Sequence, residues 1–320
     1  MSGLKSAGDE ALVEGLTIRH RDDAVERIEK RTTTLELLAS SSSVEVSRQR
    51  IEAGRHFYLF ATDEWTGFEL IYVLDGVLSI DLKEDAATSE QSILLHPGDY
   101  IYHNSLPRRV FFRVAEETEL LLVSSTPSFD LARNRVKDMV AMAQSVEEKD
   151  AATEGHCDRL GQLAIQTAEK LGLSGQSLID ISYAAYLHDI GKVNVPDEIL
   201  GKEDRLTDEE WEEMKRHPEY GAEILREKAF LTGAAAIVKA HHERFDGSGY
   251  PAGLRGEEIP IGARIIAVVD TYDAMTSERP YQKALSKGDA IAELKEHSVT
   301  QFDPEVVDAF IQVIGKNGAE

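Results

Sequence analysis

Short stretches of alternating apolar and polar residues dominate the chain from residue 34 to residue 124. Period-two alternation is typical of β-strands that bury one face. Asp75-Gly76 separates two such stretches, 68–74 and 77–82, and supplies the residue types of a tight hairpin turn. The other predicted strands are 34–38, 44–51, 57–60, 92–95, 100–102, 110–114 and 119–124. Many short strands with regular turns predict an all-β barrel or sandwich, preceded by a polar and charged stretch over residues 1–30.

After Pro127 the apolar residues are spaced by three and four positions. Within 129–149 they are Val136, Met139, Val140, Ala143 and Val146. This spacing predicts a connector helix. Two interpretations stay open, the seam of a homodimer and a helix that packs on its own domain, because the stretch holds only about two heptads.

From residue 150 onward the apolar spacing is helical. The predicted helices are 160–171, 177–188, 207–228, 234–242, 261–275, 286–296 and 304–314. Thr207 and Glu210 have the spacing of a capping box at the start of one of them. The sequence therefore predicts a multidomain α and β protein, with a β-barrel at 1–128, a connector helix at 129–149 and an all-α helical bundle at 150–320.

Composition narrows the function classes. The formal net charge is −23 over 320 residues, which argues against polymeric nucleic acid or an acidic membrane surface as partners. A small anionic substrate stays compatible, because bound metal ions can reverse the sign of the field locally. The single cysteine, the absence of an apolar run of membrane-spanning length and the polar start of the chain favour a cytoplasmic protein.

Histidines in the second half carry the candidate chemistry. A lone histidine on a helix is usually a surface residue or a satisfied one, but two adjacent pairs, His188-Asp189 and His241-His242, are harder to explain in that way. His156, His217 and Asp270 lie in the same half of the chain. Imidazole and carboxylate ligands suit transition metals, and a carboxylate can bridge two ions. The pattern predicts a two-metal site.

The second half of the chain contains His188-Asp189 followed by Gly191-Lys192, a string from His241 to Pro251 that includes Gly249-Tyr250-Pro251, and the stretch from Asp270 to Tyr281. On these motifs, residues 150–320 resemble the HD-GYP family of phosphodiesterases. The resemblance implies one metal held by His156, His188, Asp189 and Asp270, and a second held by His217, His241 and His242 and bridged through Asp189. The family's metals are iron or manganese.

The same resemblance implies cyclic di-GMP as substrate, opened to linear pGpG, with further cleavage to GMP left open. Lys192 would act with Asp189 in catalysis and stabilise phosphoryl charge, and Arg279 would hold a phosphate. Gly249 and Tyr250 would contact substrate or shape a docking loop. A GGDEF-type protein is an implied partner. The plain alternatives are a solvated helix-end cation for Lys192, surface pairing for Arg279 and an ordinary loop at Gly249.

Three positions refine the predicted site. Some family members carry a glutamate four residues before the first ligand histidine, where it recruits a third metal, but Ala152 stands there in this chain. The sequence therefore favours two metals. Asp273 lies one helical turn after Asp270 and is expected to orient a ligand histidine, and Glu243 is expected to do the same.

In the β half, six residues separate Glu69 from Gly76, and Pro97-Gly98-Asp99 follows. These positions match the glycine turns and one acidic position of the two cupin motifs, so the β half resembles a cupin. The metal histidines of that family are replaced by Asp63 and Trp65 and by Arg108-Arg109, so metal catalysis is not expected here. Two interpretations stay open: a sensor of a small anionic or aromatic ligand, contacted by Trp65 and Arg108 or Arg109, and a structural dimerisation module.

Two alternatives to the proposed phosphodiesterase are kept. One is an HD-type hydrolase of another cyclic nucleotide or dinucleotide. The other is a weakly active HD-GYP module that binds cyclic di-GMP or a protein partner in signalling. The complete set of expected ligands favours an active enzyme.

Overall fold

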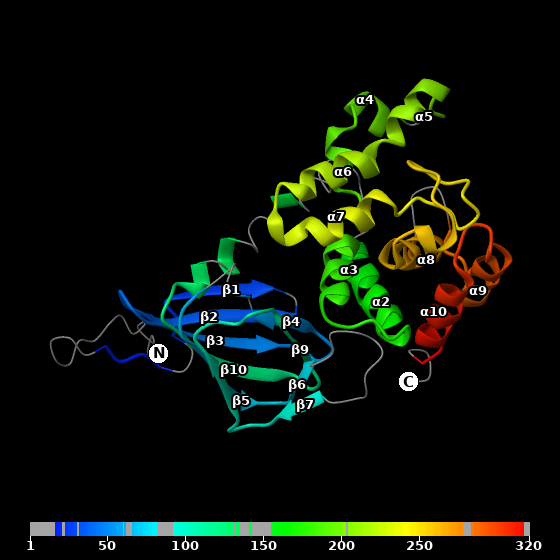
Figure 1. The fold of residues 1–320 in the computed structure, drawn as a ribbon. Coiled ribbons are helices and arrows are strands. Elements are labelled where there is room, and N and C mark those ends of the chain that lie inside the picture. The colour runs from blue at the N-terminus through cyan, green and yellow to red at the C-terminus, as the bar shows by residue number, and fades with distance from the viewer. Residues whose placement is uncertain are drawn as a thin grey trace, which may run out of the picture. The chain divides into compact units, whose positions relative to one another are not determined.

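The computed structural model describes residues 17–20, 23–30, 32–59, 61, 66–81, 92–130, 132–134, 141–142, 155–202, 204–277 and 283–316. These residues belong to two compact units (Figure 1). The described residues up to 134 form a β unit, and those from 141 onward form an α unit. The predicted fold class, a multidomain α and β protein, is confirmed.

The β unit consists of two antiparallel sheets. The larger has the strand order β1-β2-β3-β10-β5-β8 and the smaller has the order β4-β9-β6-β7. The strands are β1 Glu26–Lys30, β2 Thr33–Ser40, β3 Glu45–Ile51, β4 His56–Leu59, β5 Glu69–Asp75, β6 Leu78–Asp81, β7 Ser92–Leu95, β8 Tyr100–His103, β9 Val110–Val114 and β10 Thr118–Ser124. Inward side chains of both sheets, such as Val73, Leu78 and Phe112, share one core.

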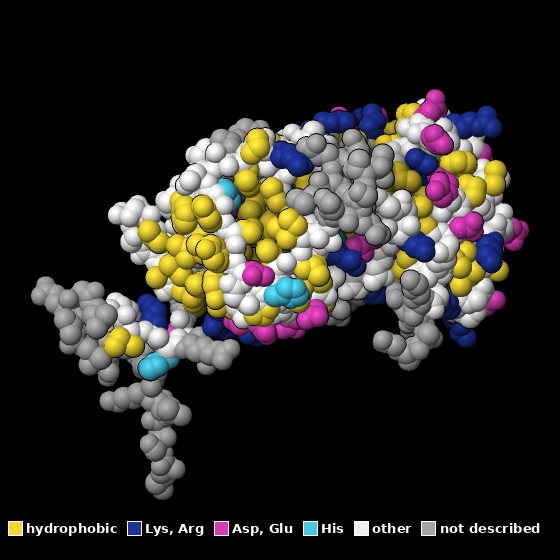
Figure 2. All heavy atoms as spheres, turned by 60° about the horizontal axis from the view of Figure 1, so that its bottom comes forward, with side chains coloured by type: hydrophobic (Ala, Val, Ile, Leu, Met, Phe, Trp, Pro, Cys, Tyr) yellow, Lys and Arg dark blue, Asp and Glu magenta, His cyan; other side chains and the backbone are white. Residues whose placement is uncertain are grey.

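Side-chain alternation explains which face each strand buries. On β5, Glu69, Ile71 and Val73 are buried. On the paired edge strand β8, Ile101 packs against the core, whereas Tyr100 and Tyr102 are 58% and 65% exposed. Figure 2 shows hydrophobic side chains gathered on one face of this unit. The period-two pattern therefore sets the orientation of these strands.

Two predictions for this unit are wrong. Asp75-Gly76 was expected to close a hairpin, but β5 pairs with β10 and β8, and β6 pairs with β7 and β9. The turn instead carries the chain from one sheet to the other. Gly76 is required there because its φ is 81° and a Cβ would lie 2.7 Å from the Thr118 Cα. Strand β1 was also missed, in a stretch interpreted only as polar.

The α unit is built from helices around one core. They are α2 His156–Lys170, α3 Gln176–Leu187, η1 Ile190–Asn194, α4 Asp197–Leu200, α5 Asp208–Met214, α6 His217–Arg226, η2 Ala229–Leu231, α7 Thr232–Lys239, η3 Gly256–Glu258, α8 Ile261–Thr276, α9 Lys287–Glu296 and α10 Pro304–Lys316. Helix α2 packs against α3, α8 and α10, and α6 packs against α7 and η1.

The helix predicted over 207–228 is two helices. Its start is as predicted, because the Glu210 amide donates to Thr207 Oγ1 at 3.2 Å and the Thr207 amide donates to Glu210 Oε2 at 2.7 Å. Helix α5 ends at Met214, and α6 begins at His217 with Pro218 in its first turn. Proline lacks the amide hydrogen of a continuous helix and is tolerated only in the first turn.

The predicted connector helix lies largely outside the described residues. Residues 128–130, 132–134 and 141–142 are helical, and the remainder of 129–149 falls in the undescribed part. No helix among the described residues is long and apolar enough to cross a membrane.

Candidate metal centre

Six of the seven predicted ligands lie at the ends of helices or in the turns between helices. His156 and His217 are the first residues of α2 and α6. His188-Asp189 joins α3 to η1, and His241-His242 follows the end of α7. Asp270 lies within α8. A side chain at a helix end can point beyond its own helix. Residues from five segments of the chain can therefore point toward one site.

The structure brings all seven side chains into two groups. One group is Asp189, His217, His241 and His242, and the other is His156, His188 and Asp270. Within each group, one ligand atom per residue lies within 4.8 Å of the others. Ligand atoms bound at about 2.1 Å to one ion, at angles of 90–109°, are about 3.0–3.4 Å apart. The separations fit divalent metal ions after small adjustments.

Asp189 faces both groups. Its Oδ1 lies 3.4 Å from His217 Nε2, and its Oδ2 lies 3.4 Å from His188 Nε2. Lys192 Nζ donates to the same Oδ2 at 2.9 Å. A carboxylate with one oxygen toward each group has the geometry of a bridging ligand.

Hydrogen bonds fix the orientation of the histidine rings. The Nδ1 atoms of His188, His217 and His241 lie 3.1, 2.9 and 2.6 Å from the carbonyl oxygens of Ala185, Met214 and Val238. A carbonyl only accepts, so each Nδ1 carries a proton, and Nε2 is the ring nitrogen that can bind a metal in its deprotonated form.

Two of the Nε2 atoms are buried without a hydrogen-bond partner. They belong to His217 and His241, each only 2% exposed. A buried polar nitrogen that lacks a partner is destabilising by about 1–3 kcal/mol unless something binds it. Both atoms belong to the group that includes Asp189, so the donor set fits a cation.

The electrostatics support the same interpretation. Burial and the neighbouring imidazoles lower the pKa of His241 well below its usual range and that of His242 to about 3. Both rings are therefore neutral at pH 7, as metal ligands must be. Burial alone would raise the pKa of Asp189, but His188 and Lys192 hold it well below its usual range. Burial lowers the pKa of His188, but Asp189 and Asp270 outweigh burial and raise it to about 9.

Asp273 fixes the orientation of the His156 ring through a hydrogen bond to Nδ1. The His156 Nδ1 donates to Asp273 Oδ2 at 2.7 Å, and Arg159 donates to Asp273 through Nε at 2.7 Å and Nη2 at 3.0 Å. This leaves His156 Nε2 facing Asp270 Oδ1 at 3.6 Å. Sequence reasoning placed Asp273 beside a ligand histidine but missed Arg159, whose only signal is its position one turn after His156.

Glu243 braces a loop, in contrast to the prediction that it would orient a ligand histidine. Its Oε1 accepts from the Ala252 amide at 2.7 Å, and its Oε2 accepts from the Leu254 amide at 3.1 Å. Gly249, in the same loop, lies against the ligand-bearing segment, because a Cβ there would lie 2.5 Å from Glu243 Cα and 2.6 Å from the His242 carbonyl oxygen. The loop therefore packs directly against the ligand-bearing segment.

Gly191 allows a similarly close approach between η1 and α6. A Cβ on Gly191 would overlap the His217 carbonyl and the Gly221 amide nitrogen. Glycine therefore lets η1 and α6 approach closely enough for Asp189 to face His217. Arg279, Ala152, Asp63 and Trp65 lie outside the described residues.

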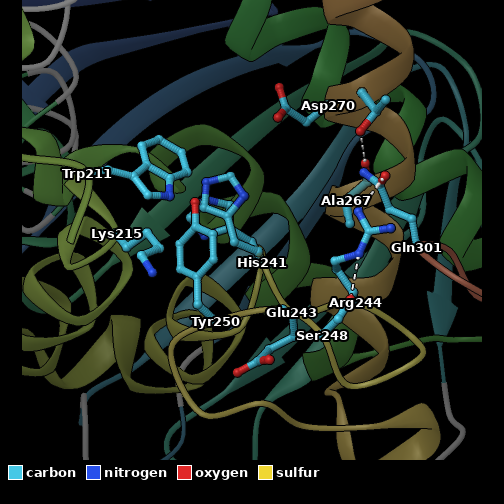
Figure 3. Close-up of a pocket in the computed structure, with 13 residues that line it drawn as sticks. Trp211, Lys215, His241, Glu243, Arg244, Ser248, Tyr250, Ala267, Asp270 and Gln301 are labelled. Carbon is cyan, nitrogen blue, oxygen red and sulfur yellow. Dashed lines mark hydrogen bonds between the residues drawn. The ribbon is translucent and has the colours of Figure 1, made fainter. Parts of the chain in front are cut away.

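A cavity of about 490 Å³ opens over both ligand groups. Its lining includes His241 and His242 from one group and Asp270 from the other. In Figure 3, Trp211, Lys215 and Tyr250 lie on one side of His241, and Asp270, Arg244 and Gln301 lie on the other. Burial raises the pKa of Tyr250 to about 12, so its hydroxyl keeps its proton at neutral pH. Trp211, Lys215, Arg244 and Gln301 were not found from the sequence.

Comparisons with known proteins point to the same half of the chain. The HD domain family matches residues 130–306. A cyclic di-GMP phosphodiesterase response regulator, RpfG of Xanthomonas campestris, is 44% identical over 173 residues, covering 53% of this chain and 46% of that protein. A 3′3′-cGAMP-specific phosphodiesterase of Vibrio cholerae is 36% identical over 241 residues, covering 75% of this chain and 43% of that protein. The chain thus spans about half the length of the curated relatives it matches.

Solved structures similar to the β unit include a cupin superfamily protein from Desulfitobacterium hafniense. The likeness has a TM-score of 0.26 and 16% identity, and it covers 37% of this chain and 98% of that one.

Proposed function

This chain belongs to the HD domain family, and on that premise we propose that it is a metal-dependent phosphodiesterase that hydrolyses cyclic di-GMP to pGpG. The observation that carries the proposal is the pair of ligand groups at one cavity, with Asp189 in one group and one of its oxygens toward His188 of the other. Dinuclear centres of this kind are a recurrent solution for phosphodiester hydrolysis. The names of several relatives, RpfG among them, support the substrate.

The ligand set suits an anionic substrate on an acidic protein. Five of the seven ligands are histidines, and Asp189 and Asp270 contribute two negative charges. Two divalent ions would carry four positive charges and leave the centre net positive, although the chain has a net charge of −23. When bound, these ions would activate a water molecule and neutralise charge on the attacked phosphate. Iron or manganese is the proposed metal, as the resemblance to the HD-GYP family implies, and the imidazole and carboxylate donors are compatible with it.

The chain's own residues supply position and charge. Asp189 has one oxygen toward His188 and the other toward His217, and the Lys192 ammonium donates to its Oδ2 and places a cation beside the centre. Asp273 and Arg159 fix the ring of His156. Tyr250 keeps a hydroxyl donor at the cavity, where it would bind a phosphate or sugar oxygen. Arg279 is proposed as a further phosphate contact, from its motif alone.

A second candidate substrate is 3′3′-cGAMP, which differs from cyclic di-GMP in one base. The V. cholerae relative, whose name states that specificity, supports it. The metal centre would act on both substrates in the same way. The preference between them therefore depends on the residues that line the cavity and contact the bases.

Product analysis tests the proposal. Protein loaded with Mn²⁺ or Fe²⁺ is incubated with cyclic di-GMP or with 3′3′-cGAMP, and the products are separated by chromatography. We expect linear dinucleotide from the preferred substrate, and chromatography also reveals any onward cleavage to GMP. Asp189→Ala should abolish turnover, whereas Asp204→Ala, which removes an exposed carboxylate of the same unit, should not. Equal turnover in Asp189→Ala would place the chemistry elsewhere.

We also propose that the β unit regulates this activity by binding a small ligand. Two separate cores support a modular arrangement. Arg109 lies over the Tyr58 ring, with 4.9 Å from its Cζ to the ring centroid, and this cation–aromatic pair is the proposed contact for an anionic or aromatic ligand. Ligands that shift the thermal unfolding of the full chain should change its turnover, and binding without any change in turnover would remove the regulatory role.

A further inference from the structure

Trp211 is an exposed aromatic side chain at the mouth of the cavity. It lies on the short helix α5, is 47% exposed and lines the cavity above the ligand histidines. A ligand that covered this large apolar ring would remove it from water, which is favourable. Its place in the lining of the cavity favours a ligand.

A second aromatic ring faces Trp211. The Trp211 and Tyr250 rings lie 6.5 Å apart between centroids and are inclined at 76°. Tyr250 is itself held against the metal centre, because its ring lies 5.0 Å from that of His242 and its amide donates to the His242 carbonyl at 3.3 Å. The Trp211 and Tyr250 rings therefore offer a ring face and a ring edge at the same part of the cavity.

Lys215, the residue that follows the end of α5, also supplies a cation. It stands four positions after Trp211, and both side chains line the cavity. The Lys215 ammonium contacts Glu212 Oε1 at 2.6 Å. Figure 3 shows Trp211, Lys215 and Tyr250 together on one side of His241. An aromatic face next to a cation is the combination that binds a nucleobase and its phosphate.

The geometry points to a nucleobase subsite. We propose that a purine of the substrate stacks on the exposed face of Trp211, with the Tyr250 ring against its edge and Lys215 attracting the attached phosphate. The proposal rests on the function proposed above and adds to it the residue that holds the base. Arg244 and Gln301, joined by a hydrogen bond of 2.8 Å from Arg244 Nη1 to Gln301 Oε1, form the opposite wall.

Fluorescence tests this subsite without any turnover. The chain has two tryptophans, so Trp65→Phe leaves Trp211 as the single emitter. GMP, which carries a purine, should quench Trp211 emission in the metal-loaded protein. Ribose 5-phosphate, which has the same phosphate and no base, should leave the emission unchanged. Equal responses to the two compounds, or none to either, would overturn the stacking assignment.

Kinetics provide the second arm. Trp211→Ala should raise KM for the cyclic dinucleotide by about 5- to 150-fold, as expected for the loss of one base–aromatic stack, with kcat and metal content little changed. Trp211→Phe should recover most of the loss. Glu209→Ala, at an exposed site on the same helix, controls for local weakening of α5.

The outcomes separate the two proposals. Turnover of cyclic dinucleotide with an unchanged KM in Trp211→Ala would refute the subsite and leave the proposed function intact. Absence of turnover with selective quenching by GMP would refute the function and keep the subsite. If Trp211→Ala fails to fold, Trp211→Phe and the fluorescence comparison still decide the matter.

Discussion

Asp273→Asn should weaken one metal position and leave the other unchanged. The Asp273 carboxylate is 3% exposed and accepts the His156 Nδ1–H at 2.7 Å, so it fixes both the tautomer and the ring orientation of that ligand. It also binds Arg159 through both oxygens. An asparagine has one acceptor oxygen and cannot satisfy both partners.

The expected magnitude follows from these contacts. Removing the carboxylate behind a ligand histidine lowers metal affinity about 10- to 100-fold. The loss should fall on the group of His156, His188 and Asp270, because Asp273 makes none of the recorded contacts of His217, His241 or His242. Folding should also be destabilised by about 1–3 kcal/mol from the lost charged hydrogen bonds, a modest figure because the Arg159 side chain is 40% exposed.

Asp303→Asn is the matched control. Asp303 is 5% exposed and binds Arg264 Nη1 at 2.5 Å in the same unit, so each variant replaces a buried aspartate that binds an arginine. Titration with Mn²⁺ against a chelator, followed by elemental analysis, measures metal per chain. One weakened site in Asp273→Asn and two unchanged sites in Asp303→Asn are expected. Wild-type affinity at both sites in Asp273→Asn would refute the assigned role of Asp273.

Three further predictions follow from the same structure. Asp189→Ala should reduce bound metal at both positions, since its two oxygens face both groups, and elemental analysis that shows only one position affected would contradict the bridge. Gly249→Ala should lower activity and destabilise the chain by about 1–3 kcal/mol through backbone overlap, whereas Gly161→Ala, with open space around it in α2, should be neutral or stabilising in thermal unfolding. Burial raises the pKa of Glu69 to about 7 beside His103. A raised carboxyl pKa stabilises below pH 4.5 and loses that contribution as pH rises through 7, so the β unit should lose up to about 3 kcal/mol over that window, and Glu69→Gln should remove the dependence in unfolding measured against pH.

The two units differ in the charge states of their buried acidic groups and histidines. The α unit places the neutral imidazoles of His241 and His242 and the ionised Asp189 at the candidate metal centre, and these are the charge states that metal ligands require. The β unit buries Glu69 against His103, where burial raises the pKa of the carboxyl and lowers that of the imidazole. The groups of the α unit therefore favour the binding of a cation. In the β unit, burial favours the uncharged forms of Glu69 and His103.

The order of the elements and the residues of the two candidate ligand groups were readable from the sequence. Period-two and period-three-to-four spacing are local properties of the chain, so most strands and helices were predicted close to their observed bounds. Adjacent pairs such as His188-Asp189 and His241-His242 are equally local. Together with His156, His217 and Asp270, they come together as two groups in the structure.

Only the tertiary structure decided how these pieces meet. Asp75-Gly76 reads as a hairpin locally, yet the sheets to which β5 and β6 pair are set by partners far along the chain. Glu243 stands beside a ligand pair in sequence, but packing turns it toward the loop that follows. Arg159 and Trp211 have no distinctive local signal, since their roles depend on Asp273 and Tyr250, more than 35 residues away in each case. Local periodicity determines whether a segment forms a strand or a helix. Long-range packing determines which other side chains its residues contact.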